Sequence, residues 1–429
     1  MKKVLIVTYY WPPSGGGGVQ RWLKFSKYLP EFGWQPIIFT PENPDFEIRD
    51  FSLLQEIPEE IEVLKFPIWE PYTLFDKISG HTNKKHRKQG VVDGSRKTVF
   101  SRISKWIRGN IFIPDPKVFW VGSSVEFLVD YIRDNSIDHI VTTGPPHSMH
   151  MIGLKLKKKT GVAWVADFSD PWVRWDILKK FHLSWPAMQV HKRLESAVVR
   201  NADIVLTVSE TWANEIKKDH GKEAQVITNG YDYQDFRSSN HTVDKKFIIS
   251  HSGLVNEFRN PQNLWVALTE LCKEDEEFDK MLQIEFSGIV DSQVLDAIKS
   301  DKILGSKFKF NDYVSHQEVL KIYNSSSVLL LLLNNTDNAM GHLPGKLFEY
   351  LPSNRYILAI GATEGDSAKI IQETETGISC NPEDMAGIKK AISSFFTHFK
   401  NGNFPDSVNI EKYSRKVLTR KLADVFEQI

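Results

Sequence analysis

The segment at residues 341–351 has the sequence Gly-His-Leu-Pro-Gly-Lys-Leu-Phe-Glu-Tyr-Leu, and two of its side chains could bind a nucleotide. The Pro-Gly pair is typical of the start of a helix. Because Lys346 and Glu349 are three residues apart, a helix would place them on one face. A lysine in the first turn, beside unpaired N–H groups, favours a diphosphate, and the glutamate can accept hydrogen bonds from two ribose hydroxyls. The alternative is an ion pair on a helix surface.

Four consecutive glycines at residues 15–18 form a second candidate site. They lie between an apolar run and a helical pattern. Glycine lets a ligand approach the backbone at a helix N-terminus, where N–H groups attract anions. The segment matches neither the P-loop nor the GxGxxG pattern. It is therefore either an anion-binding loop or a flexible turn.

The elements that would position these residues alternate between strands and helices. An apolar run at 4–9, the glycine loop, a helical spacing from Val19 and a second apolar run at 36–40 are typical of the start of a doubly wound α/β domain. The pattern continues with predicted strands at 139–143, 162–166 and 204–208 and predicted helices at 151–159 and 185–201.

The alternation starts again after a polar stretch at 232–241. We therefore expect an α/β protein with two Rossmann-like, doubly wound domains, 1–232 and 233–410, which bind the ligand in a central cleft at the carboxyl ends of their strands. An amphipathic helix at 411–429 is expected to return to the first domain. The second series predicts strands at 246–250, 282–287, 328–333 and 356–360 and helices at 262–272, 293–301, 317–324 and around 347–351.

The composition excludes several classes of protein. The 429 residues include 54 basic and 54 acidic side chains, so the net charge does not favour a nucleic-acid partner. The charge is divided unequally, since residues 1–200 carry 29 basic and 21 acidic side chains and the remainder carries 25 and 33. The two cysteines, Cys272 and Cys380, are too few and too far apart for a disulfide scaffold or a cysteine zinc site.

The segment at 81–108 is strongly basic, with nine Lys and Arg residues and one acid, Asp93. One interpretation is a solvated loop. The other is a patch that binds an anionic membrane surface, because Ile103, Trp106 and Ile107 alternate with the cations near its end, and each cation near such a surface contributes about 1 kcal/mol.

Further motifs occur in a fixed order along the chain. Together with residues 4–18, they resemble retaining glycosyltransferases of the GT-B fold, glycosyltransferase family 4 (group 1), in the branch that builds bacterial cell-surface polysaccharide. The resemblance covers nearly the whole chain. The motifs are Ile-Pro-Asp-Pro-Lys at 113–117, Thr-Gly-Pro-Pro-His-Ser-Met-His at 143–150, Ala-Asp-Phe-Ser-Asp-Pro-Trp at 166–172, Ile-Thr-Asn-Gly-Tyr-Asp at 227–232, His-Ser-Gly at 251–253 and Arg-Asn-Pro at 259–261.

The resemblance implies a site for a nucleotide-diphosphate sugar in the second domain. Glu349 matches the second glutamate of the family's E-x7-E motif, which holds the donor ribose, whereas Gly341 stands where the first glutamate is expected. Lys346 would lie beside the diphosphate, and Arg259 would be its basic clamp. The implied donor-binding residues are Gly16, Gly17, Gly253, Gly345, Lys346 and Glu349.

In the first domain, the resemblance assigns Asp170 and His147 to the acceptor pocket. The alternative for Asp170 is a carboxylate that forms a turn, and the alternative for His147 is a hydrogen-bonded structural histidine. We therefore expect Arg259, Lys346, Asp170 and His147 to be the catalytic residues.

Sugar transfer from such a donor develops negative charge on the leaving diphosphate, so catalysis needs anion stabilisation and positioning. Two cations and a helix N-terminus can supply these without a metal ion or a cofactor, and no Asp-x-Asp pair is placed to carry a metal. The expected function is transfer of the sugar, with retention, to a saccharide or lipid-linked saccharide acceptor in polysaccharide or lipopolysaccharide synthesis. The alternatives are a nucleotide-sugar 2-epimerase of the same fold and a non-catalytic scaffold that binds sugar nucleotides.

The sequence also predicts where the protein acts. The longest apolar run, residues 328–333, is far shorter than the roughly 20 residues that span a bilayer. The N-terminal apolar run is soon interrupted by Pro12 and Pro13, unlike a signal peptide. We expect a cytoplasmic protein, or one that is peripheral at the inner face of the plasma membrane.

Overall fold

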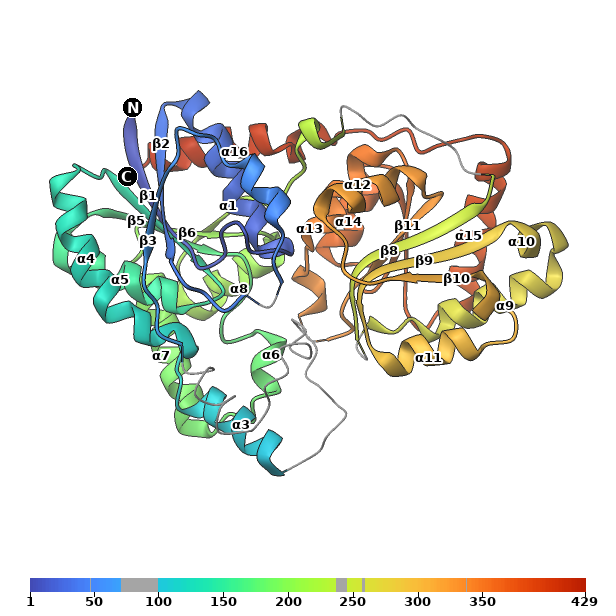
Figure 1. Ribbon diagram of the computed structural model, residues 1–429, viewed down its shortest axis with the longest axis horizontal. Coiled ribbons are helices and arrows are strands. Elements are labelled where there is room, and N and C mark those ends of the chain that lie inside the picture. Colours follow the sequence, from blue (N-terminus) through green and yellow to red (C-terminus); the bar gives the residue numbers. More distant parts are fainter. Residues whose placement is uncertain (47, 71–98, 237–244, 257–258, 337) are drawn as a thin grey trace. The chain divides into compact units, whose positions relative to one another are not determined.

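The computed structural model describes residues 1–46, 48–70, 99–236, 245–256, 259–336 and 338–429, with the backbone alone for 99–104. The chain divides into two compact units (Figure 1). Unit 1 contains Met1–Thr228 and Arg415–Ile429, and unit 2 contains Asn229–Ser414. The sequence places its boundaries after residues 232 and 410, each four residues from the limits of these units.

Unit 1 is built on a parallel sheet of seven strands in the order β3-β2-β1-β4-β5-β6-β7. The predicted doubly wound α/β architecture is confirmed. The strands are β1 (Lys2–Val7), β2 (Trp34–Pro41), β3 (Glu62–Phe66), β4 (His139–Gly144), β5 (Ala163–Phe168), β6 (Ile204–Thr207) and β7 (Ala224–Val226). The helices are α1 (Gly17–Tyr28), α3 (Val99–Asn110), α4 (Val121–Asp134), α5 (Ser148–Thr160), α6 (Asp176–Lys179), α7 (Trp185–Asn201), α8 (Glu210–His220) and α16 (Arg415–Phe426).

Strand β1 shows why the central strands of unit 1 are continuous apolar runs. Successive side chains of a strand point to opposite faces, and both faces of this sheet are covered by helices. Val4 and Ile6 pack into a core with residues of α1 and α16. Leu5 and Val7 pack into a second core with residues of α4, α5 and α7. A strand at the centre of this sheet therefore has no side that can remain polar.

The last helix of the chain, α16, belongs to unit 1, which confirms the predicted return of the C-terminus. It lies beside α1 (Figure 1). Phe426 packs edge-on against Trp34 of β2, with ring centroids 5.0 Å apart. Leu418 and Leu422 are buried in the same core.

Unit 2 is built on a parallel sheet of six strands in the order β10-β9-β8-β11-β12-β13. The strands are β8 (Phe247–Val255), β9 (Leu282–Val290), β10 (Phe308–Asn311), β11 (Val328–Leu332), β12 (Tyr356–Ile360) and β13 (Gly377–Cys380). The helices are α9 (Gln262–Glu274), α10 (Glu276–Met281), α11 (Ser292–Ser300), α12 (His316–Ser325), α13 (Gly345–Tyr350), α14 (Asp366–Glu373) and α15 (Met385–Lys400).

Near the carboxyl end of the central strand β8, two glycines pair with each other across the sheet. Gly253 of β8 lies opposite Gly288 of β9. A Cβ atom on Gly288 would lie 2.6 Å from the carbonyl oxygen of Gly253, far closer than a carbon can approach. Glycine at 288 therefore lets the two backbones run together at the carboxyl edge of the sheet.

Within the part of the chain that the structure describes, none of the helices has the length and apolar character needed to cross a bilayer.

Candidate functional site

Lys346, the second residue of α13, is the centre of a group of polar residues at the carboxyl ends of β8 and β11. We call this group the unit 2 cluster, and its members are His251, Ser252, Gly253, Arg259, His342, Lys346 and Glu349. The ammonium of Lys346 donates a hydrogen bond of 2.6 Å to the carbonyl oxygen of Ser252. Burial and the nearby charge of Arg259 lower the pKa of Lys346 to about 7. The ammonium is therefore held against the end of β8 at a cost that a bound anion would relieve.

Gly253 makes the position of Lys346 possible. A Cβ atom on Gly253 would lie 2.5 Å from Nζ of Lys346. Gly253 also has a φ of +131°, which side-chain-bearing residues rarely adopt. Glycine at 253 is thus explained by the contact with Lys346 as well as by the backbone conformation.

Arg259 is the second cation of the unit 2 cluster. Its Nε donates a hydrogen bond of 2.5 Å to Oδ1 of Asn334, which follows β11. Its charge contributes to the lowered pKa of Lys346, His251 and His342. The two cations therefore lie close enough to repel each other, and their common field favours an anion.

Two histidines and a serine add polar atoms to the unit 2 cluster. His251 is buried, and its Nδ1 lies 2.9 Å from the carbonyl oxygen of Leu330. Its Nε2, Nδ1 of His342 and Oγ of Ser252 have no hydrogen-bond partner among the described residues. Burial lowers the pKa of His251 well below its usual value and that of His342 to about 3, so both rings are neutral at pH 7. These atoms are suited to hydrogen bonds with a polar ligand.

Glu349 is held by α12 and does not pair with Lys346. The hydroxyl of Tyr323 donates to Oε2 of Glu349 at 3.1 Å, and Nε2 of His316 lies 3.2 Å from Oε1. The alternative of an ion pair on the helix surface is therefore wrong. Each carboxylate oxygen has two lone pairs, so the carboxylate keeps capacity for the hydroxyls of a ligand.

The helix that carries Lys346 and Glu349, α13, has six residues. Gly345 opens α13, as predicted, with Pro344 at the N-cap position. A helix of six residues has a weak dipole, because few peptide units add to it. Any anion bound by the unit 2 cluster therefore depends on the side chains of Arg259 and Lys346 rather than on the helix N-terminus.

In unit 1, the glycine loop leads into α1, a helix of 12 residues. Gly16 is the N-cap, and its φ of +85° is a conformational reason for glycine at this position. A Cβ atom on Gly17 would meet no atom within 4 Å. The structure thus confirms a glycine loop before a helix, and the space at Gly17 is compatible with a ligand near the backbone.

Arg21, which the sequence does not single out, anchors this loop. Two nitrogens of Arg21 donate to the two oxygens of the buried Asp167, both at 2.9 Å. The indole N–H of Trp22 donates to the same carboxylate at 2.8 Å. Asp167 lies near the carboxyl end of β5, so this contact holds the start of α1 at the edge of the sheet. The only signal in the sequence is a basic residue three positions after the last glycine.

His147 and Asp170 lie near the carboxyl ends of β4 and β5. The ring of His147 is buried and stacks on Trp172, with centroids 4.8 Å apart and planes 3° apart. Neither ring nitrogen has a hydrogen-bond partner among the described residues. Burial, with His150 and His191 nearby, lowers the pKa of His147 well below its usual value. Asp170 is partly exposed, two residues after β5.

Comparison with known proteins agrees with this architecture. Residues 112–230 match the family model of the glycosyl transferase 4-like domain. None of the curated proteins matches the sequence significantly. Sucrose-phosphate synthase from Thermosynechococcus elongatus has a similar structure, with a TM-score of 0.64 and 13% identity over 100% of this chain and 99% of that one. The protein HepE from Anabaena, solved in complex with UDP and glucose, gives a TM-score of 0.62 and 13% identity over 100% of both chains.

The chain has the GT-B fold. WaaG, a glycosyltransferase involved in lipopolysaccharide biosynthesis, also has a similar structure, with a TM-score of 0.57 and 12% identity over 99% of both chains. At such identities the likeness establishes the fold alone.

Gly253 of β8 and Gly345 of α13 should respond differently to substitution by alanine. We expect Gly253→Ala to lower the free energy of unfolding by about 1–3 kcal/mol, because alanine is strained at this φ and contacts Lys346. Gly345→Ala is the matched control, since a Cβ atom there meets nothing within 4 Å. Chemical denaturation followed by circular dichroism measures both, and equal stabilities would contradict the assigned role of Gly253.

Proposed function

We propose that the protein is a glycosyltransferase that moves a sugar, with retention, from a nucleotide-diphosphate sugar to a saccharide acceptor. The observation that carries the proposal is the unit 2 cluster. In this cluster the positive charges of Arg259 and Lys346 are close enough to act on each other, and Glu349 follows Lys346 by one helical turn. This pattern suits a diphosphate next to a ribose, and it lies at the carboxyl edge of a doubly wound sheet, where such folds bind ligands.

The proposed chemistry needs stabilisation of the leaving diphosphate. Positive charge develops at the anomeric carbon and negative charge on the diphosphate as the bond between them breaks. We assign Arg259 and Lys346 to this negative charge and propose that no metal ion is required. Glu349, positioned by Tyr323 and His316, is assigned to the ribose hydroxyls. Retention of configuration is proposed on the family resemblance.

Unit 1 is assigned to the acceptor. Its candidate acceptor residues are His147 and Asp170, whereas Gly16 and Gly17 are assigned to the donor. All four follow β1, β4 and β5 at the carboxyl edge of the sheet. Because burial keeps the His147 ring neutral, we assign it to hydrogen bonding and stacking rather than to proton donation. The complex of HepE with UDP and glucose and the role of WaaG in lipopolysaccharide biosynthesis support a nucleotide sugar and a saccharide as substrates.

The acceptor is proposed to be lipid-linked, which would place a cytoplasmic enzyme at the inner membrane face in polysaccharide or lipopolysaccharide synthesis. The basic segment at 81–108 supports this location. Residues 81–98 lie outside the described part of the chain. The last turns of α3 are described, and there Trp106 is 46% exposed beside Lys105.

The donor site is tested by calorimetry with a panel of nucleotide-diphosphate sugars, without added metal. One donor should bind saturably, and Lys346→Ala or Glu349→Ala should weaken it about tenfold or more, because each removes a charged hydrogen-bond partner. Lys302→Ala and Glu364→Gln change exposed residues of unit 2 and should have no effect. Absence of binding by the folded protein would contradict the proposal, and binding without transfer to any saccharide would favour a scaffold.

Donor affinity should depend on pH through Lys346. In the ligand-free protein its pKa is about 7, and a diphosphate favours the charged form. Affinity should therefore fall as pH rises from 7 to 9, with proton uptake on binding, while His251 and His342 remain neutral throughout. Calorimetry in two buffers of different ionisation enthalpy measures the uptake. Lys346→Arg should flatten the profile, and a flat profile in the unchanged protein would contradict this assignment.

Membrane binding is tested by cosedimentation with vesicles that contain anionic lipid. The double variant Lys105→Glu and Trp106→Ala should bind less, since it reverses one charge and removes an exposed aromatic side chain. Lys155→Glu, on the exposed face of α5, is the matched charge control. Equal cosedimentation of all three proteins would contradict a membrane role for this segment.

A further inference from the structure

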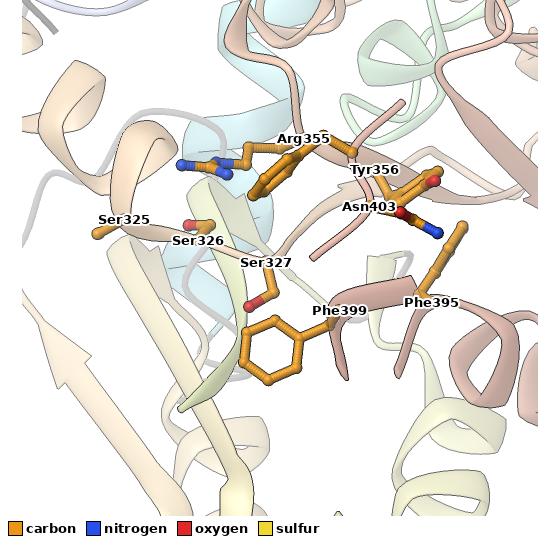
Figure 2. A pocket seen from close by; sticks show the side chains of 9 residues that line it. Ser325, Ser326, Ser327, Arg355, Tyr356, Phe395, Phe399 and Asn403 are labelled. Atoms are coloured by element: carbon orange, nitrogen blue, oxygen red, sulfur yellow. The ribbon is translucent and has the colours of Figure 1, made fainter. Parts of the chain in front are cut away.

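A pocket lies at the amino ends of β11 and β12, at the opposite edge of the unit 2 sheet from the unit 2 cluster (Figure 2). Its enclosed space is about 10 Å³, and the hollow measures about 310 Å³ when the open solvent above it is counted. Three serines that follow one another at the end of α12 form one side. Arg355 and Tyr356 enter from the start of β12, and aromatic residues of α15 form the wall. We call it the Arg355 pocket.

Arg355 is a buried cation, with 2% of its surface exposed. Its Nη2 donates a hydrogen bond to the carbonyl oxygen of Asn324, and its guanidinium lies 4.8 Å from the ring centre of Phe404. Its Nε has no hydrogen-bond partner among the described residues. No described carboxylate forms an ion pair with it, and burial alone lowers its pKa.

A buried charge is costly unless an opposite charge and hydrogen bonds compensate it. The carbonyl of Asn324 lies at the carboxyl end of α12, so the helix dipole supplies part of the compensation. The Nε–H of the guanidinium is left without a hydrogen-bond partner among the described residues. A guanidinium presents its N–H groups in a planar fork that matches the two oxygens of a carboxylate or phosphate.

We propose that the Arg355 pocket binds a small oxyanion, a phosphate or a carboxylate, at the Nε edge of Arg355. Figure 2 shows the guanidinium directed toward the serines at the end of α12, within the lining of the pocket. The side chain of Asn403 lies at the rim and is exposed. This site is separate from the unit 2 cluster, because the two lie at opposite ends of β11.

The wall of the pocket favours an oxyanion attached to an apolar or aromatic body. Tyr356 and Phe395 stack with ring centroids 4.9 Å apart, and Phe399 completes the wall. Such surfaces favour contact with flat apolar groups. The pocket also borders the helix that holds Glu349, because Asn324 follows Tyr323 in α12.

The proposal is tested by calorimetry at pH 7 with three probes, namely inorganic phosphate, phenyl phosphate and benzoate. At least one should bind saturably, and Arg355→Gln should weaken it about tenfold or more, because a charge-assisted hydrogen bond is lost. Phosphate or phenyl phosphate would identify the phosphate class, and benzoate would identify the carboxylate class. Tighter binding of phenyl phosphate than of inorganic phosphate would assign the aromatic wall to the ligand.

Three further variants decide the outcome. Asn403→Asp adds a negative charge at the rim without touching the Arg355–Asn324 contact, so it should weaken binding even if Arg355→Gln fails to fold. Lys390→Gln removes an exposed cation of α15 and should have no effect. Lys346→Gln tests the unit 2 cluster and should also leave this binding intact. The proposal is overturned if no probe binds, if binding survives both pocket variants, or if Lys346→Gln abolishes it.

Discussion

The position of the Lys346 ammonium governs how the strand ends at the carboxyl edge of the unit 2 sheet are arranged. Lys346 lies against the carbonyl of Ser252, close to a second cation, and its pKa falls to about 7. This arrangement requires glycine at 253, because a Cβ atom there would contact the ammonium. Gly288 is required in turn, since it meets the Gly253 backbone. The neighbouring strand ends are thus shaped around a buried charge, the one that we assign to the diphosphate of the donor.

The same helix serves both edges of the unit 2 sheet. At one edge, α12 fixes the carboxylate of Glu349 through Tyr323 and His316. At the other edge, the carbonyl of Asn324 in its last turn accepts a hydrogen bond from Arg355. Lys346 and Arg355 differ in what sets their pKa. Burial and the charges of Arg259 and Glu349 act on the pKa of Lys346, whereas burial alone lowers the pKa of Arg355.

In unit 1, a buried ion pair between Arg21 and Asp167 holds the glycine loop in place. Asp167 is fully buried and accepts from Arg21 and Trp22, so its charge is paired and hydrogen-bonded, and these contacts connect β5 to α1. The glycine loop is thereby held at the carboxyl edge of the sheet. In both units the candidate residues come from segments that follow parallel strands, which the doubly wound topology gathers at one edge.

The sequence by itself determined the α/β class, the two doubly wound units and the loops that follow β1 and β11, because buried parallel strands are continuous apolar runs and glycine or proline marks their ends. It did not predict β3, whose charged and apolar residues suit an edge strand. It also did not predict the strands β7, β10 and β13 or the helices α3, α4, α6, α8, α10, α14 and α15. Only the tertiary structure decided the partners of the charged residues. The spacing within α13 left an ion pair between Lys346 and Glu349 as an alternative, whereas the structure gives them separate partners, Ser252 and Tyr323. Arg21 and Arg355 carry no local motif, since their roles depend on Asp167 and Asn324, residues distant in sequence that folding brings into contact.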